Sequence, residues 1–125
     1  MKNSSGTTVS LRDCFSQYRN VENLGSDDLW YCSKCKDHVE ATKQLDLYTI
    51  PPVLIIDVKR FKNQGIQYSD KVSDFVKVPT QGFDMGEFVL NKKGSEHLIY
   101  DLFGVVNHYG SLNYGHYKAI ALCEN

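Results

Sequence analysis

Strong net charge and long apolar runs are both missing from this chain. Its 125 residues carry 14 lysines and arginines against 15 aspartates and glutamates, a formal net charge of −1. Nothing in this balance draws the protein to nucleic acid or to an anionic membrane surface. No apolar stretch approaches the roughly 20 residues that span a bilayer, and the first residues lack the pattern of a secretory signal. We therefore expect neither nucleic acid nor a membrane as a partner.

A secreted disulfide framework is not indicated either. The chain has four cysteines, and two of them form the sequence Cys32-Ser33-Lys34-Cys35. A Cys-x-x-Cys pair is more typical of metal ligands or reduced thiols than of such a framework. This favours an intracellular protein, in the cytoplasm and/or the nucleus.

The composition that remains is that of a folded domain. Apolar residues make up 42% of the chain and aromatic residues 12%, which is enough for a single hydrophobic core and excludes a disordered chain. Residues 1–8 are polar and rich in serine and glycine, so we expect them to be a linker or an expression remnant. Residues 9–125 then form the folded part.

A short helix is predicted over residues 9–18. Thr8 or Ser10 could cap it, and Asp13 would lie in the first turn, where a negative charge is favourable. Apolar side chains follow the spacing of one helical face, at Leu11, Cys14, Phe15 and Tyr18.

Most of the remaining chain is predicted to form strands. Residues 38–48 alternate between apolar and polar, which is typical of a half-buried strand. Residues 53–58 are nearly all β-branched or aliphatic, which predicts a strand covered on both faces. Later strands are expected at 75–78, 100–106 and 116–123. The sequence therefore predicts an α+β fold, a mainly antiparallel β sheet with one N-terminal helix.

The most informative stretch is residues 107–117, Asn-His-Tyr-Gly-Ser-Leu-Asn-Tyr-Gly-His-Tyr. A loop with two glycines leads to His116 at the start of the last predicted strand, where a base can be held and still meet a substrate. Imidazole also changes charge near neutral pH. Gly115 would let a substrate backbone come close, and His108 could line the same site. A lone histidine at the end of a strand is usually an ordinary polar residue of a hairpin loop, so the longer pattern around this loop has to decide.

A longer ordered series of short motifs accompanies this loop. It comprises Asp28-Leu29-Trp30-Tyr31-Cys32, Cys35-Lys36, Ala41-Thr42-Lys43, Ile50-Pro51-Pro52, Lys59-Arg60-Phe61, Lys71-Val72, Val78-Pro79, Phe83-Asp84, Tyr100-Asp101-Leu102 and Gly115-His116-Tyr117. In this order the motifs resemble the C-terminal, histidine-box half of a ubiquitin-specific protease catalytic domain. These are papain-like cysteine deubiquitinases, and the resemblance covers roughly residues 9–122.

The resemblance implies the palm and part of the fingers of that papain-like fold, with ubiquitin and ubiquitinated proteins as partners. It implies His116 as the catalytic general base and acid. His108, Gly115 and Tyr117 would bind the substrate by lining the channel for its Gly-Gly terminus. Residues 62–70 and 110–115 would match two mobile loops beside that channel.

Two members of the family's catalytic triad have no counterpart in the sequence. The nucleophile of the family lies in an Asn-x-x-x-Thr-Cys type of box, and its third member lies in a strand after the histidine strand. Cys14 is on the predicted apolar helix face, and Cys123 points away from His116 by strand alternation, so neither is expected to substitute. The family's reaction is cleavage of isopeptide bonds after the C-terminal glycine of ubiquitin. We predict that this chain is part of such an enzyme and inactive without a cysteine-bearing N-terminal half.

The Cys32/Cys35 pair has the spacing of a zinc knuckle. Structural zinc takes four ligands, so the pair is half a site, which the resemblance would complete from the N-terminal half. A reduced, metal-free pair is the alternative, and a redox pair is disfavoured because no thioredoxin-like strand and helix flank it. No cofactor is expected for catalysis itself.

The sequence leaves two alternative functions. A non-catalytic ubiquitin-binding module of the same fold would also explain the absence of a cysteine box. A zinc-ribbon nucleic-acid binder is disfavoured by the near-neutral charge.

Overall fold

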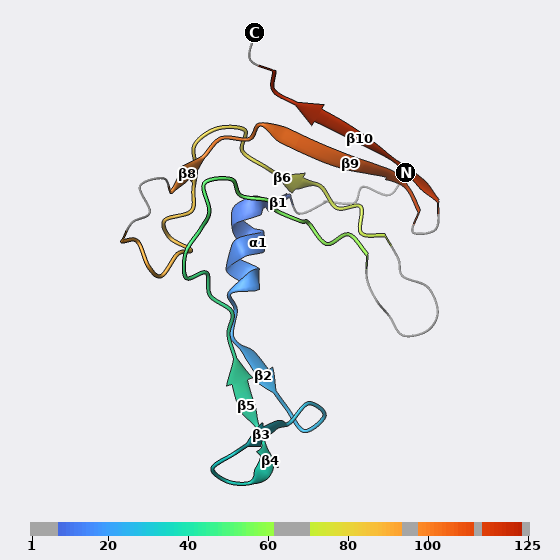
Figure 1. Ribbon diagram of the computed structural model, residues 1–125. Helices are drawn as coiled ribbons and strands as arrows, with labels where there is room; N and C mark the ends of the chain where they lie inside the picture. Colours follow the sequence, from blue (N-terminus) through green and yellow to red (C-terminus); the bar gives the residue numbers. More distant parts are fainter. Residues whose placement is uncertain (1–7, 62–70, 94–97, 112–113, 124–125) are drawn as a thin grey trace.

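The computed structural model describes residues 8–61, 71–93, 98–111 and 114–123, and all structural statements concern these ranges. Figure 1 shows a single helix between two groups of paired strands. In chain order the elements are β1 (Val9–Ser10), α1 (Leu11–Tyr18), β2 (Glu22–Leu24), β3 (Trp30–Cys32), β4 (Asp37–Val39), β5 (Ala41–Lys43), β6 (Val76–Lys77), β7 (Phe83–Asp84), β8 (Ile99–Tyr100), β9 (Gly104–Gly110) and β10 (Gly115–Ala121).

The strands form five two-stranded pairs within the described ranges. Four pairs are antiparallel, namely β2 with β5, β3 with β4, β7 with β8 and β9 with β10, whereas β1 and β6 are parallel. The predicted α+β class, with one N-terminal helix and mainly antiparallel pairing, is confirmed. The antiparallel strands are separate ribbons rather than one continuous sheet.

The predicted helix is present and begins two residues later than expected. Ser10 is its N-cap: its hydroxyl accepts a hydrogen bond from the Asp13 amide at 3.1 Å, while its own amide donates to the Asp13 carboxylate at 2.8 Å. This reciprocal capping box satisfies backbone donors that the first turn would otherwise leave unpaired. Of the two predicted caps, Ser10 is therefore the one that is used.

One face of α1 packs on the hydrophobic core. The buried residues are Leu11, Phe83, Met85, Phe88 and Val89. Phe15 covers this cluster, with ring centroids 5.9 Å from Phe83 and 5.2 Å from Phe88. The helix is also tied to the same segment by the Arg12–Glu87 ion pair and by Arg19, whose Nη1 donates to the Glu87 carbonyl at 3.0 Å. The core thus joins the beginning of the chain to residues 83–89.

An arm built from β2, β5, β3 and β4 extends away from the helix (Figure 1). The single strand predicted over residues 38–48 is wrong, because the chain changes partner at Glu40. Before that residue β4 pairs with β3, and after it β5 pairs with β2. Alternation reports which faces are apolar but not which neighbour a strand bonds to, so the break was not visible in the pattern.

The strand predicted over residues 53–58 is also wrong. No strand is assigned there, and Ile55 is 89% exposed. A β-branched run can adopt an extended backbone, but a strand also needs a hydrogen-bonding neighbour. No described residue pairs with this run.

The later strand predictions hold in part. The strand expected at 75–78 is the short β6, and the one expected at 116–123 is β10. The strand expected at 100–106 is divided into the end of β8 and the start of β9, because Leu102 leaves the ladder and donates its amide to the Thr80 carbonyl at 2.9 Å. Among the described residues, no helix is long and apolar enough to cross a bilayer.

Candidate active site

The two histidines of the glycine-punctuated loop lie on one antiparallel ribbon. β9 and β10 pair over seven residues each, with His116 opposite Tyr109 and Tyr117 opposite His108. Side chains directly opposite each other share a face, and neighbours along a strand alternate. His116 and Tyr109 therefore lie on one face of the ribbon, and His108 and Tyr117 lie on the other.

His116 is exposed at the head of β10. Its imidazole has no hydrogen-bond or ion-pair partner among the described residues. On the same face, the Lys118 ammonium lies 5.4 Å from the centroid of the Tyr109 ring. The imidazole of His116 is therefore accessible, as a base that exchanges protons with a substrate must be.

His108 is half-buried, and four residues surround its imidazole. The Tyr117 ring is 4.7 Å away and the Phe61 ring 5.8 Å, measured between centroids. Lys71 Nζ lies 3.3 Å from Nδ1. A Cβ atom built on Gly115 would lie 1.9 Å from Nε2. Three of the predicted site residues, His108, Gly115 and Tyr117, thus meet in one cluster, while the fourth, His116, is on the opposite face.

In this structure a steric contact explains why residue 115, which precedes His116, is a glycine. Sequence reasoning gave Gly115 the role of admitting a substrate backbone. The room left by its absent side chain is filled by the His108 imidazole. Any other residue at position 115 would have to displace that ring.

The turn between β9 and β10 is closed by Ser111, whose amide donates to the Tyr114 carbonyl at 2.8 Å. Gly110 has a φ of +116°, and a Cβ there would lie 2.3 Å from the Tyr114 carbonyl oxygen, so glycine is required for this turn. Residues 112–113 of the expected loop 110–115 lie outside the described residues. The other expected loop, residues 62–70, lies outside them entirely.

Sequence reasoning assigned no role to Lys71 or Phe61. The two residues form an isolated antiparallel bridge, and both contact His108. Periodicity gave no signal for either one. Their places in the ordered series of family motifs were the sole indication that these positions matter.

Cys32 and Cys35 lie at the tip of the arm, Cys32 as the last residue of β3 and Cys35 in the turn that leads to β4. Lys36, at a φ of 57°, closes this turn by donating its amide to the Cys32 carbonyl at 2.7 Å. Hydrogen bonds from the backbone amides of Cys35 and then Lys34, followed by one from the Cys35 side chain, hold the pKa of the Cys32 thiol below its ordinary value of 9.0. The turn therefore favours a thiolate, the form that binds metals.

No group of three or more metal-ligating side chains occurs within the described ranges. His38, next to the pair in sequence, packs instead against Tyr31, with ring centroids 5.3 Å apart. Cys14 is a residue of α1. The described chain thus offers two thiols for a metal and not a complete tetrahedral site.

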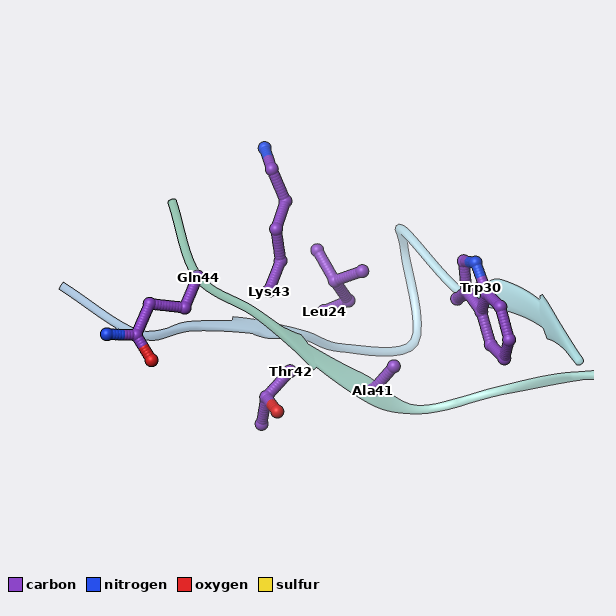
Figure 2. A pocket seen from close by; sticks show the side chains of 6 residues that line it. All are labelled: Leu24, Trp30, Ala41, Thr42, Lys43 and Gln44. Carbon is purple, nitrogen blue, oxygen red and sulfur yellow. The ribbon is translucent and has the colours of Figure 1, made fainter. Parts of the chain in front are cut away.

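The arm also carries an apolar groove of about 510 Å³. Figure 2 shows Trp30 standing at one end of it, with Lys43 extending away from the β2–β5 pair. The lining residues are Leu24, Trp30, Ala41, Thr42, Lys43 and Gln44. Histidine and cysteine are absent from this lining.

Comparison with known proteins identifies the family. A family model described as ubiquitin carboxyl-terminal hydrolase matches residues 5–125. The chain is 44% identical over 115 residues to ubiquitin carboxyl-terminal hydrolase 4 of Pongo abelii, covering 92% of this chain and 12% of that protein. It is 43% identical over 117 residues to ubiquitin carboxyl-terminal hydrolase 12 of Saccharomyces cerevisiae, covering 94% of this chain and 9% of that protein. The chain belongs to the ubiquitin carboxyl-terminal hydrolase family, as its motifs predicted.

The fold agrees with this assignment. The SAGA Ubp8/Sgf11/Sus1/Sgf73 DUB module bound to ubiquitin aldehyde matches with a TM-score of 0.70 at 29% identity, over 97% of this chain and 27% of that chain. The yeast SAGA DUB module with a mutant Sgf73 matches with a TM-score of 0.72 at 31% identity, over 90% and 25%. The chain therefore spans a minor part of the relatives and solved structures that it matches.

Proposed function

We propose that this chain supplies the histidine-bearing part of a cysteine-type deubiquitinase, a ubiquitin C-terminal hydrolase that cleaves isopeptide bonds after the last glycine of ubiquitin. The observation that carries the proposal is the position of His116. It stands exposed at the head of β10, directly after a glycine turn, in a chain that matches this family over residues 5–125.

In the proposed reaction a cysteine thiolate attacks the isopeptide carbonyl, and the bond to the lysine amine breaks. His116, protonated when the thiolate forms, gives its proton to the leaving amine. The acyl-enzyme thioester is then hydrolysed by water, which His116 deprotonates. No cofactor takes part in these steps.

The substrate tail is proposed to meet His108, Gly115 and Tyr117 as well as His116. A two-stranded ribbon is a single backbone layer thick, so a peptide that crosses its loop end can contact side chains from both faces. Because His108 fills the space beside Gly115, the glycine would contact the tail through its backbone. The aromatic rings of His108 and Tyr117 would contact the sides of the substrate tail.

The proposed partner of the chain is a cysteine-bearing N-terminal half of the catalytic domain, and the location is the cytoplasm and/or the nucleus. Two features support the proposal that a separate N-terminal half completes the domain. The sequence has no Asn-x-x-x-Thr-Cys type of box. Large apolar side chains are also exposed at Val53, Ile55 and Ile56 and along the ribbon, a pattern typical of surfaces that another chain or domain covers.

We also propose Cys32 and Cys35 as two of the four ligands of a structural zinc ion. The backbone amides that favour the Cys32 thiolate suit this role, because a metal-bound cysteine is deprotonated. The ion would link the tip of the arm to ligands from the other half. Zinc titration of the two halves mixed, against this chain alone, tests the idea, with Cys32→Ser as the control.

Hydrolysis of a fluorogenic ubiquitin C-terminal amide tests the proposed activity. We expect no turnover by this chain alone, and turnover once a segment carrying the family's cysteine box is added. His116→Ala should abolish that turnover. His38→Ala, which removes a histidine of the arm, should leave it unchanged. Turnover by the chain alone that needs His116 would refute the half-site interpretation and place a nucleophile among its own cysteines.

A non-catalytic ubiquitin-binding module is the second candidate, favoured by the lack of a hydrogen-bond partner for His116 among the described residues. It predicts ubiquitin binding without turnover even when the cysteine-bearing segment is supplied and shown to associate. Titration of ubiquitin into the mixed halves, followed by the amide assay, separates the two candidates.

A further inference from the structure

One lysine binds the end of the strand that faces the histidine strand. Lys71 Nζ donates to the carbonyl of His108 at 3.0 Å and to the carbonyl of Gly110 at 2.8 Å, and it lies 3.3 Å from Nδ1 of His108. Carbonyls two residues apart on a strand point to the same side, so one ammonium reaches both. An ammonium has three hydrogens; two of them have carbonyl acceptors here, and the third lies within reach of Nδ1.

This arrangement selects one form of the His108 ring. A lysine ammonium can donate but cannot accept, so a hydrogen bond across this 3.3 Å contact requires Nδ1 of His108 to be the nitrogen without a proton. The ring is then the neutral imidazole with its hydrogen on Nε2. In the described part of the chain Lys71 has no ion-pair partner, because the three ion pairs there involve Arg12, Arg19 and Lys43.

The ring that Lys71 holds contacts both sequence neighbours of His116. Nε2 lies where a side chain on Gly115 would begin, and the Tyr117 ring is 4.7 Å from the imidazole. His116 lies between these two residues and points to the opposite face of the ribbon. A shift of His108 would therefore disturb a contact on each side of His116, with the backbone of Gly115 and with the ring of Tyr117.

We propose that Lys71 is a positioning residue for His116 and acts through His108. Its ammonium fixes the imidazole of His108 as the Nε2–H tautomer and ties the end of β9. The His108 imidazole, held in this orientation, then fixes the positions of Gly115 and Tyr117, the two sequence neighbours of His116. Phe61, which is paired with Lys71 in an isolated bridge, also packs against the ring of His108. The effect on turnover rests on the proposed function, whereas the tautomer does not.

The test is the imidazole ¹⁵N–¹H correlation spectrum of this chain, recorded where histidine is neutral. We expect His108 to show a single Nε2–H tautomer. Lys71→Met, which removes all three donors, should give a mixture of tautomers. Lys118→Met removes an ammonium from the opposite face of the ribbon and should leave the His108 signals unchanged.

An Nδ1–H ring or a tautomer mixture in the unmodified chain overturns the proposal, whatever the variants do. So does a folded Lys71→Met chain that retains the single Nε2–H form. If Lys71→Met does not fold by its amide spectrum, Lys71→Gln replaces it, with the same expected loss of the single tautomer.

Kinetics of the mixed halves provide the second readout. A misplaced base lowers the rate of the chemical step, so Lys71→Met should lower kcat roughly ten- to a hundredfold with little change in KM. The same substitution should add no loss in a His108→Phe background, because the two residues act in series. An additive loss overturns the route through His108. Absence of turnover in the unmodified halves would refute the proposed function and leave the tautomer result standing.

Discussion

The Nε2 atom of His108 lies where a side chain on Gly115 would begin, since a Cβ there would come within 1.9 Å of it. A methyl group at this position must push the ring out or bend β10. We expect Gly115→Ala to lower the free energy of unfolding by roughly 1–3 kcal/mol, the usual range for overpacking. Urea denaturation of the chain measures this.

Gly25 provides the matched control for that substitution. A Cβ on Gly25 would meet no atom within 4 Å, so Gly25→Ala should stay within about 0.5 kcal/mol of the parent chain. Equal effects at the two glycines would show that the His108 ring yields easily. The cluster would then not be rigid.

The capping box of α1 predicts a response to acid. Hydrogen bonds from the Ser10 side chain, and then from its backbone amide, hold the pKa of the Asp13 carboxyl below its ordinary value of 3.8. This stabilisation is fully present above pH 3.8 and is lost as the pH falls through the lower folded-state pKa. Asp13→Asn should therefore flatten the acid side of the stability profile, as measured by thermal melting across pH.

Asp28→Asn is the comparison for Asp13→Asn. The Asp28 carboxylate has no hydrogen-bond or ion-pair partner in the described part of the chain. Its removal should therefore leave the dependence of stability on acid pH unchanged. A profile that Asp13→Asn does not alter would mean that the box contributes nothing to acid stability.

The turn at the tip of the arm predicts a reactive thiol. Since backbone amides lower the pKa of Cys32, its alkylation should reach half its maximal rate below pH 9.0. Mass spectrometry of labelled peptides across pH gives this value directly. Lys34→Pro removes one of the donating amides and should raise the midpoint.

Lys34→Ala keeps that amide while it removes the lysine side chain, so the Cys32 midpoint should not move. If the two substitutions shift it equally, the lysine charge rather than the amide stabilises the thiolate.

The β9–β10 ribbon predicts self-association of the chain. Val106, on the His108 face, is 68% exposed, and Ile120, on the His116 face, is 65% exposed. Exposed apolar surface on a ribbon of this kind favours contact with a second copy. Sedimentation velocity should show dimers or larger species, and Ile120→Lys should shift them toward monomer.

Val21→Lys changes an equally apolar, exposed residue between α1 and β2. It should leave the association of the chain as it was. A parent chain that is monomeric at every concentration would contradict the prediction.

Local chemistry made part of this fold predictable from sequence. The helix at α1 follows from its apolar spacing and from Ser10 and Asp13, which act within one turn. The ribbon follows from two apolar stretches around a glycine turn. Residues 53–58 and 38–48 were misjudged because strand pairing depends on distant partners, which a periodic pattern does not name.

The candidate site was predictable in its residues and not in its geometry. His108, Gly115, His116 and Tyr117 were all named from the loop and the family motifs. That His108 and His116 lie on opposite faces follows from the register of β9 and β10, which the sequence left open. Lys71 is 37 residues from His108 along the chain, and a contact at that separation leaves no local pattern.

The contacts between α1 and residues 83–89 have a consequence for the order in which the molecule assembles. Arg12 and Arg19 meet Glu87 across 75 and 68 positions of sequence, whereas β9 and β10 are joined by one short turn. Closing a long loop costs more chain entropy and slows folding. When the complete chain refolds, the histidine ribbon can therefore pair before α1 reaches residues 83–89. During synthesis the order is reversed: α1 waits with Leu11 and Phe15 uncovered until residues 83–89 have left the ribosome, and the ribbon follows them.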